Sequence, residues 1–492
     1  MPPKEKKKVT RAWPVIKAYV KAASRYPRLV ASILIGAIII QGAALVAPLF
    51  LKRLVDTLAT AEPATATYAV LLGSVALFGF AAFIGWIGQR IQMLSIMHTE
   101  SRVMVDLSNQ AFRYLLGHSH DFFVSNFAGS LTRRVNRYAR SFEQVLDTFV
   151  FSFFSLGVFS TGAILVLYQR SPAIGLALLA WTVVFVTIQV LLARWRQPLR
   201  IARAAEDSKV TGVLSDAVSN QSTISQFASE RHEFSIFGKA IENWRSATMR
   251  SWLADAWIFA IQGLFALIVE VGLLVVTVML WKQGVITVGD FVLVQVYVIG
   301  LVDRVWNLGR SLQRLYDALA EGYEMVEMLE LPHGIQDVPG AKKLEVTEGK
   351  IDLNNVSFGF GTELPVLSEL ILSVRGGEKI ALVGPSGAGK STITKLLLRL
   401  YDVTEGKIEI DGQDISQVTQ ESLREAIAFV SQEPILFHRT LMDNIRYGRQ
   451  NASDEEVLEA SKKARCHDFI SALPLGYETH VGERGIKLSG GE

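Results

Sequence analysis

The sequence predicts an α-helical membrane domain of six spans followed by an incomplete α/β domain, and three observations lead to this fold class. Six apolar runs lie within residues 29–309. Two long basic connections interrupt these runs. A glycine-rich motif follows a short apolar stretch at residues 379–383. The length of 492 residues leaves room for about three domains.

The composition sets limits on the class of protein. Half of the residues are hydrophobic and 20% are charged, below the roughly 25% of average soluble chains. The 50 basic and 47 acidic residues nearly cancel, so the charge balance gives no reason to expect nucleic acid as a partner. The single cysteine, Cys466, excludes an intrachain disulfide and any site built from several cysteines. These features favour a protein of the lipid bilayer.

Each apolar run is a candidate membrane span, because about 20 helical residues cross a bilayer of about 30 Å. The fifth run contains one acidic residue, Glu270, and the sixth is bounded by Asp290 and Asp303. We expect the membrane domain at residues 29–321, after a basic segment at residues 1–28. The expected spans are residues 29–50, 69–88, 148–168, 172–193, 256–281 and 288–309.

The distribution of lysine and arginine predicts the orientation. The N-terminal segment and two long connections, residues 89–147 and 194–255, are rich in basic residues. Basic connections stay on the cytoplasmic side of a membrane. We therefore expect a multi-pass protein of the plasma or inner membrane with a cytoplasmic N-terminus. The basic residues of the opposite connections are only Lys52, Arg53, Arg170 and Lys282.

Amphipathic patterning predicts the structure of the cytoplasmic segments. Before the first span, Trp13, Val15 and Tyr19 share a face opposite Lys17 and Lys21, which indicates a helix on the inner leaflet or, alternatively, a solvated helix. The two long connections lack clusters of proline and glycine. We expect the membrane helices to continue through them for about 25 residues, or nearly 40 Å. The expected cross-pieces lie near residues 121–129 and 219–227.

The composition changes after residue 321. Turn-forming residues such as Pro332, Gly334 and Pro339 predict a linker at residues 322–345. The remaining residues, 346–492, have the composition of a soluble domain, and residues 350–358 alternate in the manner of a β-strand.

Residues 384–391 carry the motif of a phosphate-binding loop, G-x-x-x-x-G-K-S. The apolar stretch at 379–383 predicts a strand before the loop, and residues 392–400 predict a helix after it. Glycines let backbone N–H groups approach phosphates, and the helix N-terminus adds partial positive charge. Lys390 would reach the β- and γ-phosphates, and Ser391 would hold Mg²⁺. The motif predicts a P-loop NTPase domain that uses ATP and Mg²⁺.

The side of the membrane on which this loop must lie indicates whether the sixth apolar run crosses the membrane. ATP is a cytoplasmic substrate, and the N-terminus is expected in the cytoplasm. Five crossings would place Lys390 outside the cell, whereas six place it inside. The run at residues 288–309 is therefore predicted to cross the membrane.

Further motifs resemble those of ABC transporters. Residues 488–492 resemble the signature LSGGQ, with Glu492 in place of glutamine, and residues 479–485 resemble the segment before it. Residues 429–434 resemble the Q-loop, and residues 356–360 resemble the A-loop, with Phe360 in place of tyrosine. With the six spans, the chain resembles an exporter-type half-transporter.

The resemblance implies a mechanism in which two such chains, identical or different, form a dimer that holds two ATP molecules between them. Phe360 would stack on adenine, and Gln432 would bind Mg²⁺ and couple the site to the cytoplasmic loops. The residues implied to contact the bound nucleotide are Phe360, Gly384, Pro385, Ser386, Gly387, Ala388, Gly389, Lys390, Ser391, Thr392 and Gln432. Those implied to face the partner's nucleotide are Leu488, Ser489, Gly490, Gly491 and Glu492.

Several polar residues lie in the expected spans. A carboxylate in mid-bilayer is costly, so Glu270 either lines the substrate path or is paired between helices. We interpret Gln41, Gln189, Gln262 and Gln295 as interhelical hydrogen-bonding residues. Asp303 and Arg304 are predicted to form ion pairs.

The favoured function is ATP-driven export of a lipid-like or amphipathic small molecule by a dimer. An alternative is a subunit that binds ATP without hydrolysing it and acts as a structural or regulatory partner. A third is an ATP-gated channel. The chain ends at Glu492, before the Asp-Glu strand and switch histidine that hydrolysis requires in this family. We expect the chain to be a truncated part of a longer ATPase, and we expect residues 1–492 by themselves to bind ATP weakly and not to hydrolyse it.

Overall fold

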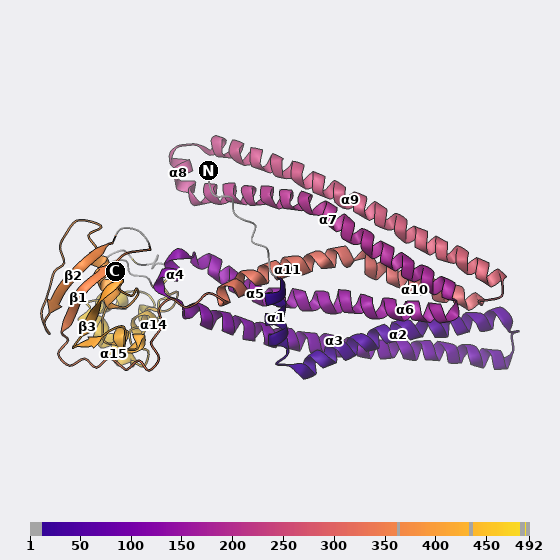
Figure 1. Cartoon of the computed structure of the whole chain (residues 1–492), viewed down its shortest axis with the longest axis horizontal. Coiled ribbons are helices and arrows are strands. Elements are labelled where there is room, and N and C mark those ends of the chain that lie inside the picture. Colours follow the sequence, from indigo (N-terminus) through magenta and orange to yellow (C-terminus); the bar gives the residue numbers. More distant parts are fainter. Residues whose placement is uncertain (1–11, 362–364, 432–435, 483–487, 489–492) are drawn as a thin grey trace. The chain divides into compact units, whose positions relative to one another are not determined.

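The computed structural model describes residues 12–361, 365–431, 436–482 and 488. The chain forms two compact units, which are treated separately below (Figure 1). The membrane unit comprises Met1–His118 and Phe122–His333, and the second unit comprises Ser119–Asp121 and Gly334–Glu492. The boundary at residue 333 lies among the residues expected to form a linker.

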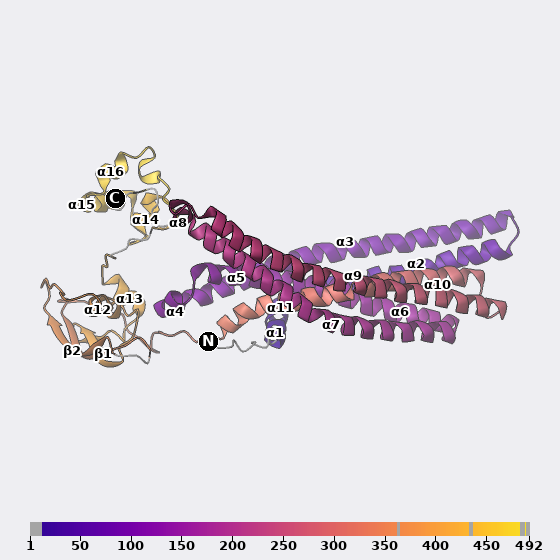
Figure 2. The ribbon, with the colours of Figure 1, turned by 90° about the horizontal axis from the view of Figure 1, so that it is seen from above.

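The described part of the membrane unit contains helices and no strands, and the first residues of its short helix α4 belong to the second unit. In Figures 1 and 2, α7 and α9 run side by side, as do α2 and α3. The helices are α1 (Ala12–Ala23), α2 (Pro27–Thr60), α3 (Thr65–Leu116), α4 (His120–Ser125), α5 (Ala128–Asp147), the π-helix η1 (Thr148–Phe154), α6 (Ser155–Arg170), α7 (Pro172–Ser219), α8 (Gln221–Gln226), α9 (Glu230–Lys282), α10 (Val288–Trp306) and α11 (Leu308–Leu329).

Among the described residues, five helices are long and apolar enough to cross a membrane. They are α2, α3, the continuous rod Ala128–Arg170, α7 and α9. The sixth expected span forms α10, which contains three charged residues, Asp290, Asp303 and Arg304. Its inclusion as a crossing rests on the parity of the topology.

Local sequence signals set several helix boundaries. Proline occupies the first turn of α2 and of α7, where a missing N–H costs nothing. At the start of α10, the Thr287 side chain and the Asp290 carboxylate form a reciprocal capping box. These caps place the starts of α7 and α10 directly after short connections.

The predicted helical continuations of the membrane spans are present. The helices α3, α7 and α9 contain 52, 48 and 53 residues, far more than a bilayer requires. The short helices α4 and α8 lie at the two expected cross-pieces. Long helices form here because each satisfies its backbone hydrogen bonds locally and buries a stripe against its neighbour.

Two apolar cores hold the membrane unit together. One joins α6, α7, α9 and α10 around Tyr297, Leu293 and Leu178. The other joins α1, α3, α5 and α11 around Leu107 and Tyr138. Each core therefore fixes a separate part of the helical bundle.

The N-terminal helix α1 packs on protein as well as presenting an apolar side outward. Val15 and Tyr19 are buried in the second core, whereas Trp13 remains 72% exposed. The Tyr19 hydroxyl donates to the Tyr138 carbonyl oxygen at 2.9 Å. The expected single apolar face is thus divided, because part of it fills a gap among α3, α5 and α11.

The helix α11 continues to Leu329, beyond the expected start of the linker at residue 322. Gly322 lies within this helix rather than ending it. A Cβ atom at Gly322 would approach the Tyr19 hydroxyl within 2.5 Å. Gly322 therefore allows α1 and α11 to pack closely. Composition alone does not distinguish a glycine at a helix contact from a glycine in a turn.

The second unit contains a small antiparallel sheet in the order β2–β1–β3–β4, with short helices around it. Its core includes Leu353, Val356, Leu396 and Ile408. The elements are β1 (Ile351–Phe358), β2 (Leu367–Val374), α12 (Lys390–Leu397), β3 (Glu405–Ile410), β4 (Gln413–Asp414), α13 (Gln420–Glu425), α14 (Leu441–Arg446), α15 (Asp454–Lys463), α16 (His467–Ser471) and the 3₁₀-helix η2 (Gly476–Glu478).

Candidate functional site

The glycine-rich loop has the backbone conformation that only glycine adopts readily. Gly384, Gly387 and Gly389 have φ angles of 154°, 84° and 83°. A Cβ atom at Gly389 would also lie 2.8 Å from Leu367 Cδ2. Side chains at these positions would therefore strain the loop or push it away from β2.

The helix α12 begins immediately after this loop, with Gly389 as its N-cap and no side-chain cap. Lys390 Nζ donates to the carbonyl oxygens of Gly384 and Pro385 at 2.9 and 2.8 Å, so its charge lies at the loop. Ser391 is exposed, whereas Thr392 is buried. An uncapped helix N-terminus, a lysine and an exposed hydroxyl suit a phosphate group with its Mg²⁺.

The strand predicted at residues 379–383 is not formed. This segment pairs with no other part of the chain that the structure describes, and Val383 is 90% exposed. A strand requires a neighbour for its backbone N–H and C=O groups, so apolar composition alone does not produce one. The predicted helix after the loop is present as α12.

The candidate adenine-binding residue, Phe360, follows β1 and is 45% exposed. Its ring lies edge-on to Phe358 and to Tyr401, with centroid separations of 4.9 and 5.3 Å. Burial raises the pKa of the Tyr401 hydroxyl. Tyr401 was not predicted, because it lies beyond α12 and belongs to no recognised motif. The two neighbouring rings fix Phe360 while leaving part of it accessible.

Two groups of predicted site residues lie outside the described residues. They are Gln432 and residues 489–492. Leu488 is described, and it packs against a small core formed by Leu441, Ile470 and Val481. This contact anchors the beginning of the signature-like segment within its own unit.

The membrane unit contains a cavity of about 440 Å³ beside α9 and α10. Glu270, Asp303 and Arg310 supply its charged groups, and Val298 and Trp306 are among its apolar lining residues. The Glu270 carboxylate accepts a hydrogen bond from Gln295 Nε2 at 2.6 Å. Glu270 thus faces a cavity and is also paired between helices, so the two interpretations of this residue are compatible.

The other intramembrane glutamines form interhelical hydrogen bonds, as predicted. Gln262 Nε2 donates to Gln189 Oε1 at 2.7 Å between α9 and α7. Arg304 Nη2 donates to Gln41 Oε1 at 3.0 Å between α10 and α2.

The prediction of ion pairs at Asp303 and Arg304 is wrong, because within the described residues neither side chain lies at ion-pair distance from an opposite charge. The Arg304 guanidinium instead lies 3.8 Å from the Phe159 ring centroid. It points toward α2 and α6, where an amide oxygen and an aromatic face replace a carboxylate.

Two family models match the chain. The ABC transporter transmembrane region matches residues 30–305, and the ABC transporter model matches residues 367–492. The chain belongs to the ABC transporter family and has the organisation of an exporter-type half-transporter. Half-transporters of this family act as dimers and couple ATP hydrolysis to transport.

The chain is similar to several characterised members of this family. It is 32% identical to an ATM1-type heavy metal exporter of Novosphingobium aromaticivorans, over 93% of this chain and 76% of that protein. It is 30% identical to the mitochondrial iron-sulfur clusters transporter atm1 of Aspergillus fumigatus, over 94% of this chain and 64% of that protein. A solved bacterial Atm1-family ABC exporter with ATP bound matches with a TM-score of 0.80 and 32% identity, over 94% of this chain and 81% of that one.

Proposed function

We propose that this chain forms a dimer that uses ATP to export a metal-containing complex with organic ligands. The similar proteins are named as exporters of heavy metals or transporters of iron-sulfur clusters. The metal is cargo in this proposal and not a resident cofactor. The relatives include bacterial and mitochondrial proteins, and we propose the plasma or inner membrane here, with the second unit in the cytoplasm, because the expected cytoplasmic segments are strongly basic.

The observation that carries the proposal is the mixed lining of the 440 Å³ cavity. Glu270 and Asp303 offer negative charge, Arg310 offers positive charge, and Trp306 offers an aromatic surface. A complex with a charged centre and organic ligands matches all three features. Because unpaired charge in a bilayer is costly, these groups gain most when they face such a cargo.

The second unit supplies the energy. Lys390 and the N-terminus of α12 would bind phosphate, and Phe360 would hold the adenine ring by stacking. Ser391 and Gln432 would hold Mg²⁺, which neutralises charge on the phosphates when bound. Residues 488–492 would face the nucleotide of the partner subunit.

A second candidate cargo is a lipid-like or amphipathic molecule without a metal. It is favoured by the apolar part of the same cavity, to which Val298, Ile299 and Val302 contribute. The two candidates differ in their need for the charged groups. A neutral lipid would depend little on Glu270, whereas a charged complex would depend on it strongly.

The cargo is tested by ATPase stimulation of the full-length protein in nanodiscs. Metal–thiol complexes and uncharged amphiphiles are titrated separately against wild type, Glu270→Gln and Glu230→Gln. Glu230 is exposed at the far end of the same helix and provides the matched control. We expect stimulation by the metal complex to weaken at least about tenfold in Glu270→Gln only. Stimulation by amphiphiles alone, unchanged in Glu270→Gln, would favour the lipid-like cargo.

The nucleotide site is tested by Lys390→Ala, with Lys395→Ala in the same helix as the control. We expect Lys390→Ala to abolish ATP turnover, because it removes the charge at the phosphate loop. Lys395→Ala should retain most of the activity. Turnover in Lys390→Ala at the wild-type rate would exclude this assignment. A wild-type protein that binds ATP without turnover would instead support the structural or regulatory alternative.

A further inference from the structure

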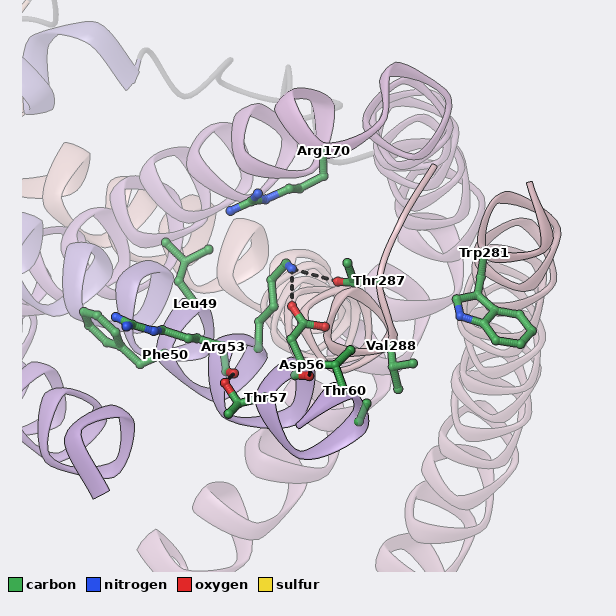
Figure 3. Close-up of a pocket in the computed structure, with 12 residues that line it drawn as sticks. Leu49, Phe50, Arg53, Asp56, Thr57, Thr60, Arg170, Trp281, Thr287 and Val288 are labelled. Atoms are coloured by element: carbon green, nitrogen blue, oxygen red, sulfur yellow. Dashed lines mark hydrogen bonds and ion pairs between the residues drawn. The ribbon is translucent and has the colours of Figure 1, made fainter. Parts of the chain in front are cut away.

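The outward end of the membrane unit contains a pocket of about 740 Å³ among the ends of α2, α6, α9 and α10. In Figure 3, the Arg170 side chain comes from α6, whereas Arg53 and Asp56 come from α2. Trp281 of α9 also lines the pocket. The orientation predicted from basic residues places this pocket on the side of the membrane opposite the cytoplasm.

Three of the four basic residues in the expected outer connections line this one pocket. They are Lys52, Arg53 and Arg170, and only Lys282 does not contribute. Basic residues on the outer side oppose the charge bias that orients the protein, so orientation does not account for them. Their convergence from two helices on one cavity indicates a binding role.

Two carboxylates, Asp56 in the pocket lining and the nearby Asp290, accept hydrogen bonds from neighbouring residues. Asp56 accepts from Lys52 Nζ at 2.6 Å and from the Gly289 N–H at 2.6 Å. Asp290 accepts from the Thr287 N–H and hydroxyl, each at 2.9 Å. Lys52 Nζ lies 3.4 Å from the second Asp290 oxygen. We refer to Lys52, Asp56, Thr287 and Asp290 as the outer cluster.

Lys52 is the one cation shared by the two carboxylates of the outer cluster, and Arg53 and Arg170 take no part in it, so both remain available to an external partner. Both are exposed, and neither has an ion pair within the described residues. Counting Lys52, Arg53 and Arg170 against Asp56 and Asp290 leaves the site with a net charge of about +1, which favours an anion. Guanidinium groups bind phosphate through paired N–H donors.

The pocket also has the position and the walls of a lipid-binding site. Phe50, Trp281 and Val288 line it, and these are terminal residues of three expected spans. They therefore lie where the hydrocarbon layer meets the headgroups. Tryptophan is typical of that level. Basic pockets between membrane helices bind anionic headgroups on the cytoplasmic side, and the same pairing of guanidinium with phosphate is available on the outer side. A free anion in water would use the arginines but not the apolar walls.

We propose that this pocket binds the phosphate group of an anionic phospholipid from the outer leaflet, with Arg53 and Arg170 as the anion-binding residues. The phospholipid would place its headgroup at the arginines and its glycerol and chains along Phe50 and Trp281. This inference is independent of the cargo and of ATP turnover.

The experiment measures lipid retention by the purified full-length protein in phosphatidylcholine nanodiscs, with and without phosphatidylglycerol, by native mass spectrometry. The variants are Arg53→Gln, Arg170→Gln and, as a matched control at the remaining outer cation, Lys282→Gln. We expect preferential retention of phosphatidylglycerol by wild type, lowered roughly tenfold in each arginine variant and within about twofold of wild type in Lys282→Gln. Arg53→Lys should retain part of the preference.

A second measurement separates the lipid from a free anion. Inorganic phosphate is added to the protein in phosphatidylcholine nanodiscs, and the thermal unfolding midpoint is recorded. We expect phosphatidylglycerol, but not phosphate, to raise the midpoint. Equal retention of both lipids, or equal retention by all variants, would exclude this pocket as a site for anionic phospholipid. A rise of the unfolding midpoint with phosphate alone that depends on the arginines would show that the site binds a free anion and not a lipid. Unchanged midpoints of the variants in pure phosphatidylcholine confirm that they fold.

Discussion

The outer cluster and the Gln189–Gln262 pair both place polar side chains inside the membrane unit, but the two regions satisfy the hydrogen-bonding needs of these side chains differently. At the outer end, one ammonium and two carboxylates are held by hydrogen bonds of 2.6–2.9 Å and by an ion pair at 3.4 Å, and Asp290 Oδ1 has that ion pair but no hydrogen bond. Deeper in the bundle, Gln189 and Gln262 share one hydrogen bond and leave other polar atoms unsatisfied. Neutral pairs in membranes contribute little, on average about 0.6 kcal/mol.

This comparison separates a region that resists rearrangement from one that permits it. Breaking a buried charge network leaves uncompensated charge, whereas breaking an amide pair leaves a neutral dipole. We therefore expect the outer ends of α2 and α10 to stay joined, while α7 and α9, which the Gln189–Gln262 pair joins, shift more readily relative to one another. Each of the following substitutions tests that difference.

The largest effect is expected for Lys52→Ala. It leaves Asp56 and Asp290 without their shared cation, and removing one partner of a buried pair costs about 3–5 kcal/mol. The thermal unfolding midpoint of the membrane unit should fall by several degrees. The exposed Lys282→Ala should change stability by no more than about 0.5 kcal/mol. Adding Asp290→Asn to Lys52→Ala should recover part of the loss; no recovery would mean that charge is not the cause.

The next largest effect is expected for Gly289→Ala. A Cβ atom there would lie 2.4 Å from the Lys52 carbonyl oxygen and 2.7 Å from Asp56 Oδ1. The resulting shift of α10 away from α2 should cost about 1–3 kcal/mol. Gly272→Ala in α9, where the added methyl meets open space, provides the control. A midpoint equal to wild type in Gly289→Ala would show that the outer cluster tolerates displacement.

A pH change sharpens the comparison at a third site, where a neutral ring becomes charged. His118 is buried, and its ring stacks on Phe122 with a centroid separation of 4.0 Å. Burial, with a smaller contribution from His333, lowers the pKa of His118. As the pH falls, the unfolded chain therefore takes up a proton at His118 before the folded chain does, so the stability of the fold is retained above about pH 6.5 and falls below it.

The substitution His118→Phe should reduce this loss of stability on acidification, whereas His232→Phe at an exposed position should not. The loss of stability is measured by thermal unfolding at a series of pH values. If His118→Phe were as sensitive to acid as the wild type, His118 would not be the cause of the loss.

The smallest effect is expected for the double substitution Gln189→Leu and Gln262→Leu. It removes one interhelical hydrogen bond and also the two unsatisfied polar atoms, so the net change should be about 0.6 kcal/mol or less. The single substitutions should cost more than the double, because each leaves an amide without its partner. A loss as large as that of Lys52→Ala would remove the distinction between the two regions.

The sequence predicted the helices of the membrane unit more completely than the second unit, for a physical reason. Helices such as α3 and α9 satisfy their backbone locally, so an apolar run and its polar continuation were sufficient to find them. Residues 379–383 have the composition of a strand, but no neighbouring strand pairs with them among the described residues. The periodicity of a sequence does not show whether a pairing strand is available.

The candidate sites show the same limit. Local motifs located the phosphate loop and Phe360, whereas Tyr401 is brought to Phe360 only by the fold. The contact between Lys52 and Asp290 joins residues that are remote in the sequence, and no spacing rule predicts it. Glu270 was identified because a carboxylate in an apolar run is unusual by itself, but its partner Gln295 required the structure.

The helix α9 joins two of these places without an interruption. Its 53 residues contain no proline, Glu270 lies at the cavity, and Trp281 lies at the outer pocket. If α9 tilts as one rod when cargo binds, the same tilt changes the shape of the pocket at its outer end. Thermodynamic reciprocity then requires that cargo alter the affinity for the headgroup by the same factor by which the headgroup alters the affinity for cargo. The lipid composition of the outer leaflet would in that case set the working concentration range of the exporter.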